Sequence, residues 1–212
     1  GDPAHRRPDI RLQHGRNRPE VPERGGRRPD PLPLLIMRRI IFSAAMSLDG
    51  YIAGPKGEYD WIPHEPEIDW TEFLDRFDTV LMGRKSYEAL LRQPSLDTFA
   101  GMSVVVASRT LDPAEHPDVT VLGKDLQVFV DGLRGSEGKE IWLFGGGELL
   151  RTMLDLGQVD QLEVALVPVI LGVGVPLLPP WNHRSPLALE TARTYTSGIV
   201  LLTYQVVPNP PD

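Results

Sequence analysis

The sequence predicts an α/β domain whose mostly parallel central sheet is finished by antiparallel strands. Between residues 40 and 156, short apolar runs alternate with segments in which apolar residues recur at helical spacing. This order is typical of parallel strands joined by helices. After Gln158 no helix of any length is indicated, and residues 161–170, 187–195 and 199–207 all have the character of strands. Consecutive strands without a helix between them pair antiparallel, so these segments should close the sheet.

The predicted elements follow one another along the chain. Residues 40–45 are a short apolar run without helical period and predict a buried strand. A loop over 46–54 contains a brief extended piece at Tyr51 and Ile52, and an irregular loop over 57–66 contains Trp61. Further strands are predicted over 79–82, 103–107, 119–122 and 140–144, and helices over 67–77, 84–92, 125–134 and 147–156.

Composition separates the chain into three parts. Residues 1–36 contain eight Arg, no Lys and seven of the 21 prolines, and we expect this Arg/Pro-rich extension to be disordered. Residues 37–207 should form one domain with its own core, and residues 208–212 a short tail. Our preferred interpretation is that Met37 is the translation start. The alternative is a basic arm that contacts nucleic acid, although the net charge of the extension is only +3.

Charge and residue types argue against several classes of function. Residues 37–212 carry 14 basic and 24 acidic side chains, which disfavours nucleic-acid binding through a broad positive surface. No apolar run approaches the length of a membrane span. The absence of cysteine excludes disulfides and thiol catalysis and fits a cytoplasmic protein. The three His of the domain have no metal-ligand spacing, so we expect no metal site.

Three turns have the composition of phosphate sites. The apolar run 141–144 ends at three glycines and is followed by a helical pattern. Bare backbone at a helix N-terminus presents N–H groups and a favourable dipole to an anion. Residues 82–88 and 104–110 place small or hydroxylic residues and fixed positive charge directly after a strand. Three such sites predict one extended polyanionic ligand. The alternative is that the glycines only allow a tight turn.

These motifs occur in an order that resembles the dihydrofolate reductase superfamily. The chain is more closely similar to its bacterial branch related to the C-terminal reductase domain of the bifunctional riboflavin-biosynthesis deaminase-reductase. The resemblance covers nearly all of 37–207 and rests on SLDGYIA at 47–53, LMGRKSYE at 81–88, ASR at 107–109, FGGG at 144–147 and LGVGVPL at 171–177. It implies a dihydrofolate reductase-like three-layer fold. The Rossmann fingerprint GxGxxG is absent.

The resemblance implies that NADPH binds across the C-terminal ends of the strands. The residues that it assigns to the cofactor are Ala45, Gly83, Arg84, Lys85, Ser86, Ser108, Arg109, Gly145, Gly146, Gly147, Glu148 and Leu149. Residues 84–86 would open a helix onto the phosphates, Ser108 and Arg109 would hold the adenosine 2′-phosphate, and the glycines would let the backbone approach the pyrophosphate. Ala45 would leave room for the nicotinamide. The alternatives are an ion pair between Arg84 and Glu88 and an exposed loop position for Arg109.

The resemblance also implies candidates for the reacting end of the site. Asp49 belongs to the loop expected beside the nicotinamide, where a carboxylate can orient substrate or relay a proton. Its alternative role is that of an Asp-Gly turn residue that bonds its own backbone. Asp69 falls near the carboxylate that binds the pterin in dihydrofolate reductases, although acids are common at helix N-termini for the dipole alone. Trp61 would either line a flat substrate site or belong to the core.

We therefore predict a cytoplasmic NADPH-dependent reductase, homodimeric by analogy with its relatives. It would transfer hydride to a C=N or C=O group of a small heterocyclic substrate, with a proton from Asp49, Asp69 or water. One alternative is a riboflavin-pathway pyrimidine reductase that acts on 5-amino-6-(5-phosphoribosylamino)uracil, for which the sequence offers no convincing second phosphate site. A second alternative is a non-catalytic NADP-binding protein.

Overall fold

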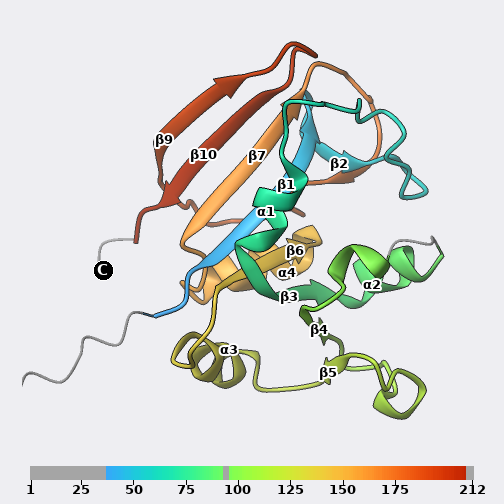
Figure 1. The fold of residues 1–212 in the computed structure, drawn as a ribbon, viewed down its shortest axis with the longest axis vertical. Helices are drawn as coiled ribbons and strands as arrows, with labels where there is room; N and C mark the ends of the chain where they lie inside the picture. Colours follow the sequence, from blue (N-terminus) through green and yellow to red (C-terminus); the bar gives the residue numbers. More distant parts are fainter. Residues whose placement is uncertain (1–36, 93–95, 209–212) are drawn as a thin grey trace, which may run out of the picture. The chain divides into compact units, whose positions relative to one another are not determined.

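An eight-stranded sheet organises residues 37–92 and 96–208, which are the residues that the computed structural model describes. Our expectations for residues 1–36 and 209–212 fall outside them. The strand order is β5-β4-β3-β6-β1-β7-β10-β9 (Figure 1). Each pair of neighbours from β5 to β7 is parallel, and these strands are β5 (Thr120–Leu122), β4 (Ser103–Ala107), β3 (Phe77–Gly83), β6 (Glu140–Gly145), β1 (Ile40–Ser47) and β7 (Gln161–Val167).

Two antiparallel strands finish the sheet. β10 (Val200–Val206) pairs antiparallel with β7, and the edge strand β9 (Leu187–Thr194) pairs antiparallel with β10. Figure 1 shows this hairpin beside β7. The predicted mostly parallel sheet with antiparallel C-terminal strands is therefore confirmed.

Helices cover both faces of the sheet. Side chains alternate between the faces along a strand. In β1, Ile41 packs in one core cluster with Tyr87 of α2 (Arg84–Leu91), and α1 (Trp70–Asp75) packs against the same cluster. Ile40 and Phe42 pack in a second cluster with residues of α3 (Leu126–Arg134) and α4 (Gly147–Asp155). The result is the three-layer α/β fold that the sequence predicts.

The largest difference from prediction concerns the first helix. We expected it over 67–77, but α1 begins only at Trp70 and ends at Asp75. Asp69 has an extended backbone and caps the helix, because its carboxylate accepts a hydrogen bond from the Glu72 N–H at 2.9 Å. Phe77, which fits the helical period, instead opens β3.

Several short elements carry too little periodicity for prediction. β2 (Tyr51–Ala53) was expected as an extended piece, but its antiparallel partner β8 (Val175–Pro176) was not. Single 3₁₀ turns occur at Leu96–Phe99 and Pro113–Glu115. The β2-β8 pair joins the 47–53 motif to the 171–177 motif, which the chain separates widely.

Candidate active site

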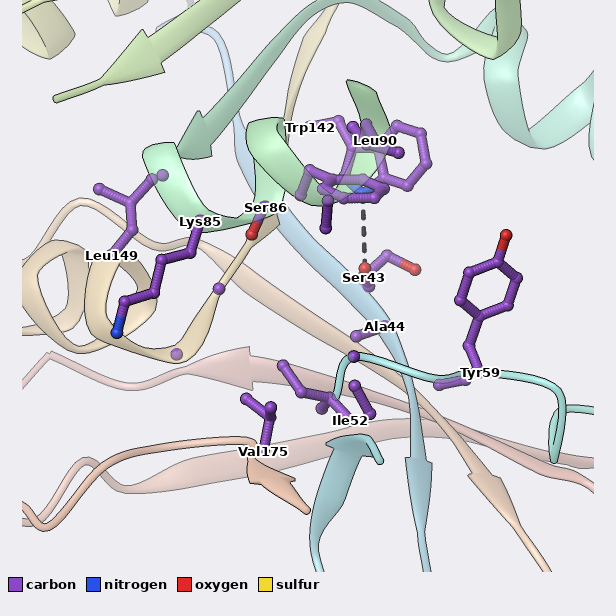
Figure 2. A pocket seen from close by; sticks show the side chains of 18 of the residues that line it. Ser43, Ala44, Ile52, Tyr59, Lys85, Ser86, Leu90, Trp142, Leu149 and Val175 are labelled. Carbon is purple, nitrogen blue, oxygen red and sulfur yellow. Dashed lines mark hydrogen bonds between the residues drawn. The ribbon is translucent and has the colours of Figure 1, made fainter. Parts of the chain in front are cut away.

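A cavity of about 1650 Å³ opens at the carboxyl ends of the parallel strands. Open α/β sheets bind their ligands at this position. Figure 2 shows Ser43 and Ala44 of β1, Lys85 and Ser86 of α2, and Leu149 of α4 around the same space. A pocket for one drug-sized ligand reaches about 1000 Å³. The cavity therefore has room for a large cofactor and a second molecule beside it.

Two of the predicted phosphate turns lie next to each other. They follow β3 and β6, which are parallel neighbours with Leu81 opposite Leu143. A Cβ atom at Gly83 would lie 3.8 Å from the Gly145 carbonyl oxygen. Gly83 and Gly146 are the N-caps of α2 and α4, and neither helix has a side-chain cap. Two helix N-termini with free N–H groups therefore meet at one edge of the cavity.

The glycines of the second turn are required by its geometry. Gly145 has a φ of +115°, in the region that favours glycine, and its peptide bond to Gly146 is cis. A Cβ at Gly147 would overlap the carbonyl oxygen of Leu177 and lie 3.1 Å from the carbonyl carbon. The loop after β8 thus packs directly against the start of α4, which only a residue without a side chain allows.

The charged residues at the start of α2 differ in their partners. Arg84 pairs with Glu88 at 2.7 Å, and both side chains line the cavity. The predicted alternative for Arg84 is therefore present in this structure. Lys85 is exposed and has no ion pair among the described residues, and Ser86 faces the Gly146 turn, with its Oγ 3.4 Å from a Cβ placed there.

The third predicted turn, after β4, is joined by a turn that sequence reasoning missed. The Ser108 N–H donates to the Leu122 carbonyl at 2.9 Å, which brings the turn after β4 beside Gly123 and Lys124. The Ser108 hydroxyl accepts from the N–H groups of Thr110 (3.2 Å) and Leu111 (3.0 Å), which leaves its own proton free to donate. Arg109 is exposed, and within the described ranges neither it nor Lys124 has an ion pair. Both line the cavity.

The floor of the cavity is formed by β1 and β7. Ala45 and Ala165 are register partners on these strands, and both line the cavity. Trp142 and Phe144 of β6 form a wall, with ring centroids 5.2 Å apart in an edge-to-face arrangement. Small side chains below and aromatic rings at the side make a recess suited to flat rings.

Asp49 does not line the cavity. Its carboxylate accepts hydrogen bonds from the Ser47 hydroxyl (2.7 Å) and from the N–H groups of Leu171 (3.1 Å) and Gly172 (2.7 Å). The Ser47 hydroxyl, with the two backbone N–H groups, holds the pKa of Asp49 below its usual value despite some desolvation. The carboxylate braces the β1-β2 turn against the 171–177 loop. A catalytic role for Asp49 stays a prediction, which this placement does not favour.

Asp69 and Trp61 also lie outside the lining of the cavity. Asp69 is the N-cap of α1, so its carboxylate has the dipole-related role that we weighed as an alternative. Trp61 packs against the cluster of Val167, Tyr195 and Ile199, and its indole N–H donates to the Glu58 carbonyl at 3.1 Å. The aromatic residues that do line the cavity include Tyr59, Trp70, Trp142 and Phe144.

Glu65 is a cavity residue that the sequence analysis missed. Its side chain is almost fully buried and accepts hydrogen bonds from the N–H groups of Glu67 (3.0 Å) and Ser197 (3.2 Å). The Ser197 hydroxyl, followed by the Glu67 N–H, holds the pKa of Glu65 below its usual value. Glu67 in turn bonds the Thr196 hydroxyl at 2.9 Å. The two carboxylates fasten the 54–69 loop to the β9-β10 turn.

Glu163 is a second carboxylate that we did not predict in the site. It lies on β7, lines the cavity and pairs with Arg76 at 2.8 Å. Burial works against the charge of Arg76, but its hydrogen bonds and charge pairing with Glu163 and Glu140 outweigh this and raise its pKa. The only local signal was a pair of polar residues, Gln161 and Glu163, in a strand that the fold buries.

The geometry agrees with a match to a known family. The model of the RibD C-terminal domain matches residues 38–201. The chain belongs to this family. All five motifs on which the resemblance rests lie within the matched residues.

Two proteins of Bacillus subtilis (strain 168) are related over nearly their whole length. YyaP is 35% identical over 181 residues, which cover 80% of this chain and 96% of YyaP. YwjB is 26% identical over 167 residues, which cover 77% of this chain and 96% of YwjB.

Solved structures with low sequence identity share the fold. A protein of Shewanella sp. PV-4 named for riboflavin biosynthesis has a TM-score of 0.68 at 23% identity, covering 80% of this chain and 99% of that chain. A pyrimidine reductase-like protein of Corynebacterium diphtheriae has a TM-score of 0.61 at 17% identity, covering 81% and 93%. The diaminohydroxyphosphoribosylaminopyrimidine deaminase/5-amino-6-(5-phosphoribosylamino)uracil reductase of Thermotoga maritima has a TM-score of 0.64 at 16% identity, with 81% of this chain covering only 57% of that longer chain.

Neither a membrane-spanning helix nor a metal-binding cluster is found among the described residues. Among residues 37–92 and 96–208, no helix has the length and apolar character needed to cross a membrane. The same residues contain no group of three or more His, Asp or Glu side chains arranged to hold a metal ion.

Proposed function

We propose that this protein is an NADPH-dependent reductase that transfers hydride to a C=N or C=O group of a small heterocyclic substrate. The observation that carries the proposal is the meeting of two uncapped helix N-termini at the edge of one large cavity. Helix N-termini favour phosphate through free N–H groups and their dipole. A dinucleotide with three phosphate groups matches this arrangement in charge.

The described residues fit the phosphates of such a cofactor. The pyrophosphate would lie against Gly146 and Gly147 and the first residues of α2, where no side chain blocks the backbone. The carboxylate of Glu148, which would repel phosphate, is paired with Arg151 at 2.8 Å. The adenosine 2′-phosphate would accept a hydrogen bond from the Ser108 hydroxyl and would pair with Arg109 and Lys124, because these groups line the cavity and the two cations have no competing ion pair among the described residues.

The nicotinamide end would occupy the recess above Ala45 and Ala165, the register partners in the cavity floor. When bound, NADPH supplies the hydride from C4 of its nicotinamide ring. The chain orients both rings between the strand floor and the 54–69 loop, and it excludes water from the space between them. Because neither Asp49 nor Asp69 lines the cavity, we favour water as the source of the proton.

The family supports a reductase and raises a second candidate substrate. Two of the structural neighbours are named as a pyrimidine reductase-like protein and as a 5-amino-6-(5-phosphoribosylamino)uracil reductase. That phosphorylated pyrimidine needs a cationic site apart from the cofactor. Lys56 and Arg92 line the cavity and supply candidate cations for it. Turnover of this pyrimidine with NADPH would distinguish it from other heterocycles.

The proposal includes a homodimer. β9 is an edge strand, and its Leu187 and Leu189 are exposed by 43% and 56%. Exposed apolar residues on an edge strand favour pairing with another chain. Light scattering on the purified protein should give twice the monomer mass, and a monomer mass would contradict this part of the proposal.

The proposed function is tested by titrating the full chain with NADPH and with NADH and monitoring binding by nicotinamide fluorescence. Binding that prefers NADPH would support the cofactor site, and a panel of carbonyl and imine compounds would then report turnover. Binding of neither cofactor would refute the reductase. NADPH binding without turnover on the panel would favour the non-catalytic alternative.

A further inference from the structure

We propose that Ser43 and Glu163 form a polar notch in the cavity floor that selects flat nitrogen heterocycles with an N–H donor on the ring edge. The inference deepens the proposed function, since it assigns the substrate side of the same cavity. It concerns substrate choice, because Ser43 and Glu163 lie two residues before Ala45 and Ala165 on the same face of their strands, and the reacting rings would stack over these two alanines.

The two residues are neighbours by strand register. Ser43 of β1 is the Cα partner of Glu163 of β7. Side chains of register partners point to the same face of a sheet, and both residues line the cavity. The next cavity-lining partners along these strands are Ala45 and Ala165. The notch is therefore a polar pair in an otherwise apolar strand floor.

Aromatic side chains border the notch. The Trp142 indole N–H donates to the Ser43 carbonyl at 3.4 Å, which holds the indole beside β1 (Figure 2). Phe73 packs edge to face on Trp142 with ring centroids 5.0 Å apart, and it also lines the cavity. A flat ring that stacks in this recess would present its edge to the notch.

The notch has unused hydrogen-bonding capacity. The Glu163 side chain is only 8% exposed and accepts from Arg76 at 2.8 and 3.1 Å and from Gln161 at 2.7 Å. A carboxylate offers about four acceptor sites, so one remains for a ligand. Within the described part of the chain, the Ser43 hydroxyl has no hydrogen-bond partner. The pair thus offers one fixed acceptor and one hydroxyl that can donate or accept.

The Arg76 ion pair makes Glu163 a fixed acceptor. Two parallel hydrogen bonds from one guanidinium hold the carboxylate plane in place. A ring with an N–H at its edge would donate a hydrogen bond to the remaining acceptor site of the Glu163 carboxylate. A ring without one would displace water and leave that acceptor site unpaired. Discrimination of this kind is strong where the polar group is buried.

The test uses two probes with the same ring system that differ by one amino group, 2-aminoquinazoline and quinazoline. Calorimetry on the full chain saturated with NADP⁺ should give a preference of about tenfold or more for the amino compound, as expected for a hydrogen bond to a charged group. Ser43→Ala and Glu163→Gln should each reduce this preference several-fold. Glu140→Gln is the matched control, since it also removes a carboxylate from Arg76 (3.2 Å) but does not line the cavity.

Three results would overturn the inference. Equal affinities of the wild-type chain for the two probes would refute it. So would an equal loss of preference in Glu140→Gln and Glu163→Gln, because the effect would then pass through Arg76 and the fold. An unchanged preference in Ser43→Ala, a variant that breaks no ion pair, would remove Ser43 from the notch. Cofactor affinity is read separately by NADPH fluorescence, and the probes are also titrated without cofactor, so failure of the proposed function is distinguishable.

Discussion

Replacing Arg109 by Ala should weaken NADPH binding much more than NADH binding. Arg109 is exposed at the rim of the cavity and has no ion pair in the described segments, so its guanidinium is available for a phosphate. NADH lacks the 2′-phosphate and would lose nothing at this position. The substitution therefore isolates the contact that distinguishes the two cofactors.

The size of the effect follows from the surroundings of Arg109. A hydrogen bond to a charged group contributes about 1.5–3 kcal/mol. The lower part of this range applies here, because the site is exposed to solvent and because Lys124 on the neighbouring turn would keep a positive charge. We expect a loss of about 1.5–2 kcal/mol, which raises the Kd for NADPH roughly 10- to 30-fold. The Kd for NADH should change by less than about twofold.

Nicotinamide fluorescence titrations at low and moderate salt would measure both constants. The NADPH effect should shrink as salt rises, because exposed charges are screened. Arg184→Ala is the matched control, since Arg184 is also exposed but does not line the cavity. Equal losses for NADPH and NADH in Arg109→Ala would refute the placement of the 2′-phosphate, as would an equal effect of the control.

The remaining predictions concern stability and the other cation. Gly147→Ala should lower the free energy of unfolding measured in urea by about 1–3 kcal/mol, because the new methyl group meets the Leu177 carbonyl. Gly132→Ala should raise it by about 0.4–1 kcal/mol, because Gly132 lies in α3 with open space around it. The pKa values of Asp49 and Glu65 are lowered in the folded protein, so the unfolded chain binds more protons than the folded one in acid. The stabilisation that these two carboxylates contribute should therefore be complete above about pH 5 and decrease as the pH falls below about 4. Asp49→Asn should make this decrease in the free energy of unfolding less steep. Arg84→Ala should weaken the binding of NADPH and of NADH, and by less than Arg109→Ala weakens the binding of NADPH. The reason is that Arg84 already forms an ion pair with Glu88. A tolerated Gly147→Ala, an unchanged acid slope in Asp49→Asn or a larger NADPH loss in Arg84→Ala would contradict the respective prediction.

The elements of the fold could be predicted wherever burial leaves a periodic pattern. β1, β3, β4 and β6 are apolar runs because helices cover both faces of the sheet. The first helix was predicted too long, because Phe77 fits the helical period and only the cap at Asp69 and the start of β3 set the true limits. β8 has two residues and carries no period at all.

The residues of the cofactor side could be predicted because each turn has a local signature, but their meeting could not. Gly83 and Gly145 are brought together by the pairing of β3 with β6, strands that two others separate in the sequence. Lys124 enters the site only because β5 pairs with β4. A turn with positive charge therefore indicates a phosphate site, while the sheet order determines which turns share a ligand.

The role of a carboxylate depended on partners that lie far away in the sequence. An Asp-Gly pair at 49–50 predicts a turn, but the bracing role of Asp49 comes from the N–H groups of Leu171 and Gly172, more than 120 residues later. Glu163 gains its fixed position from Arg76 on another element, at a separation of 87 residues. The sequence motif around Asp49 predicts a functional carboxylate, but Asp49 does not line the cavity. Almost nothing in the sequence indicates Glu163, which lies in the cavity floor. The role of each carboxylate is therefore set by the distant partner that the fold brings to it, backbone N–H groups for Asp49 and an arginine for Glu163.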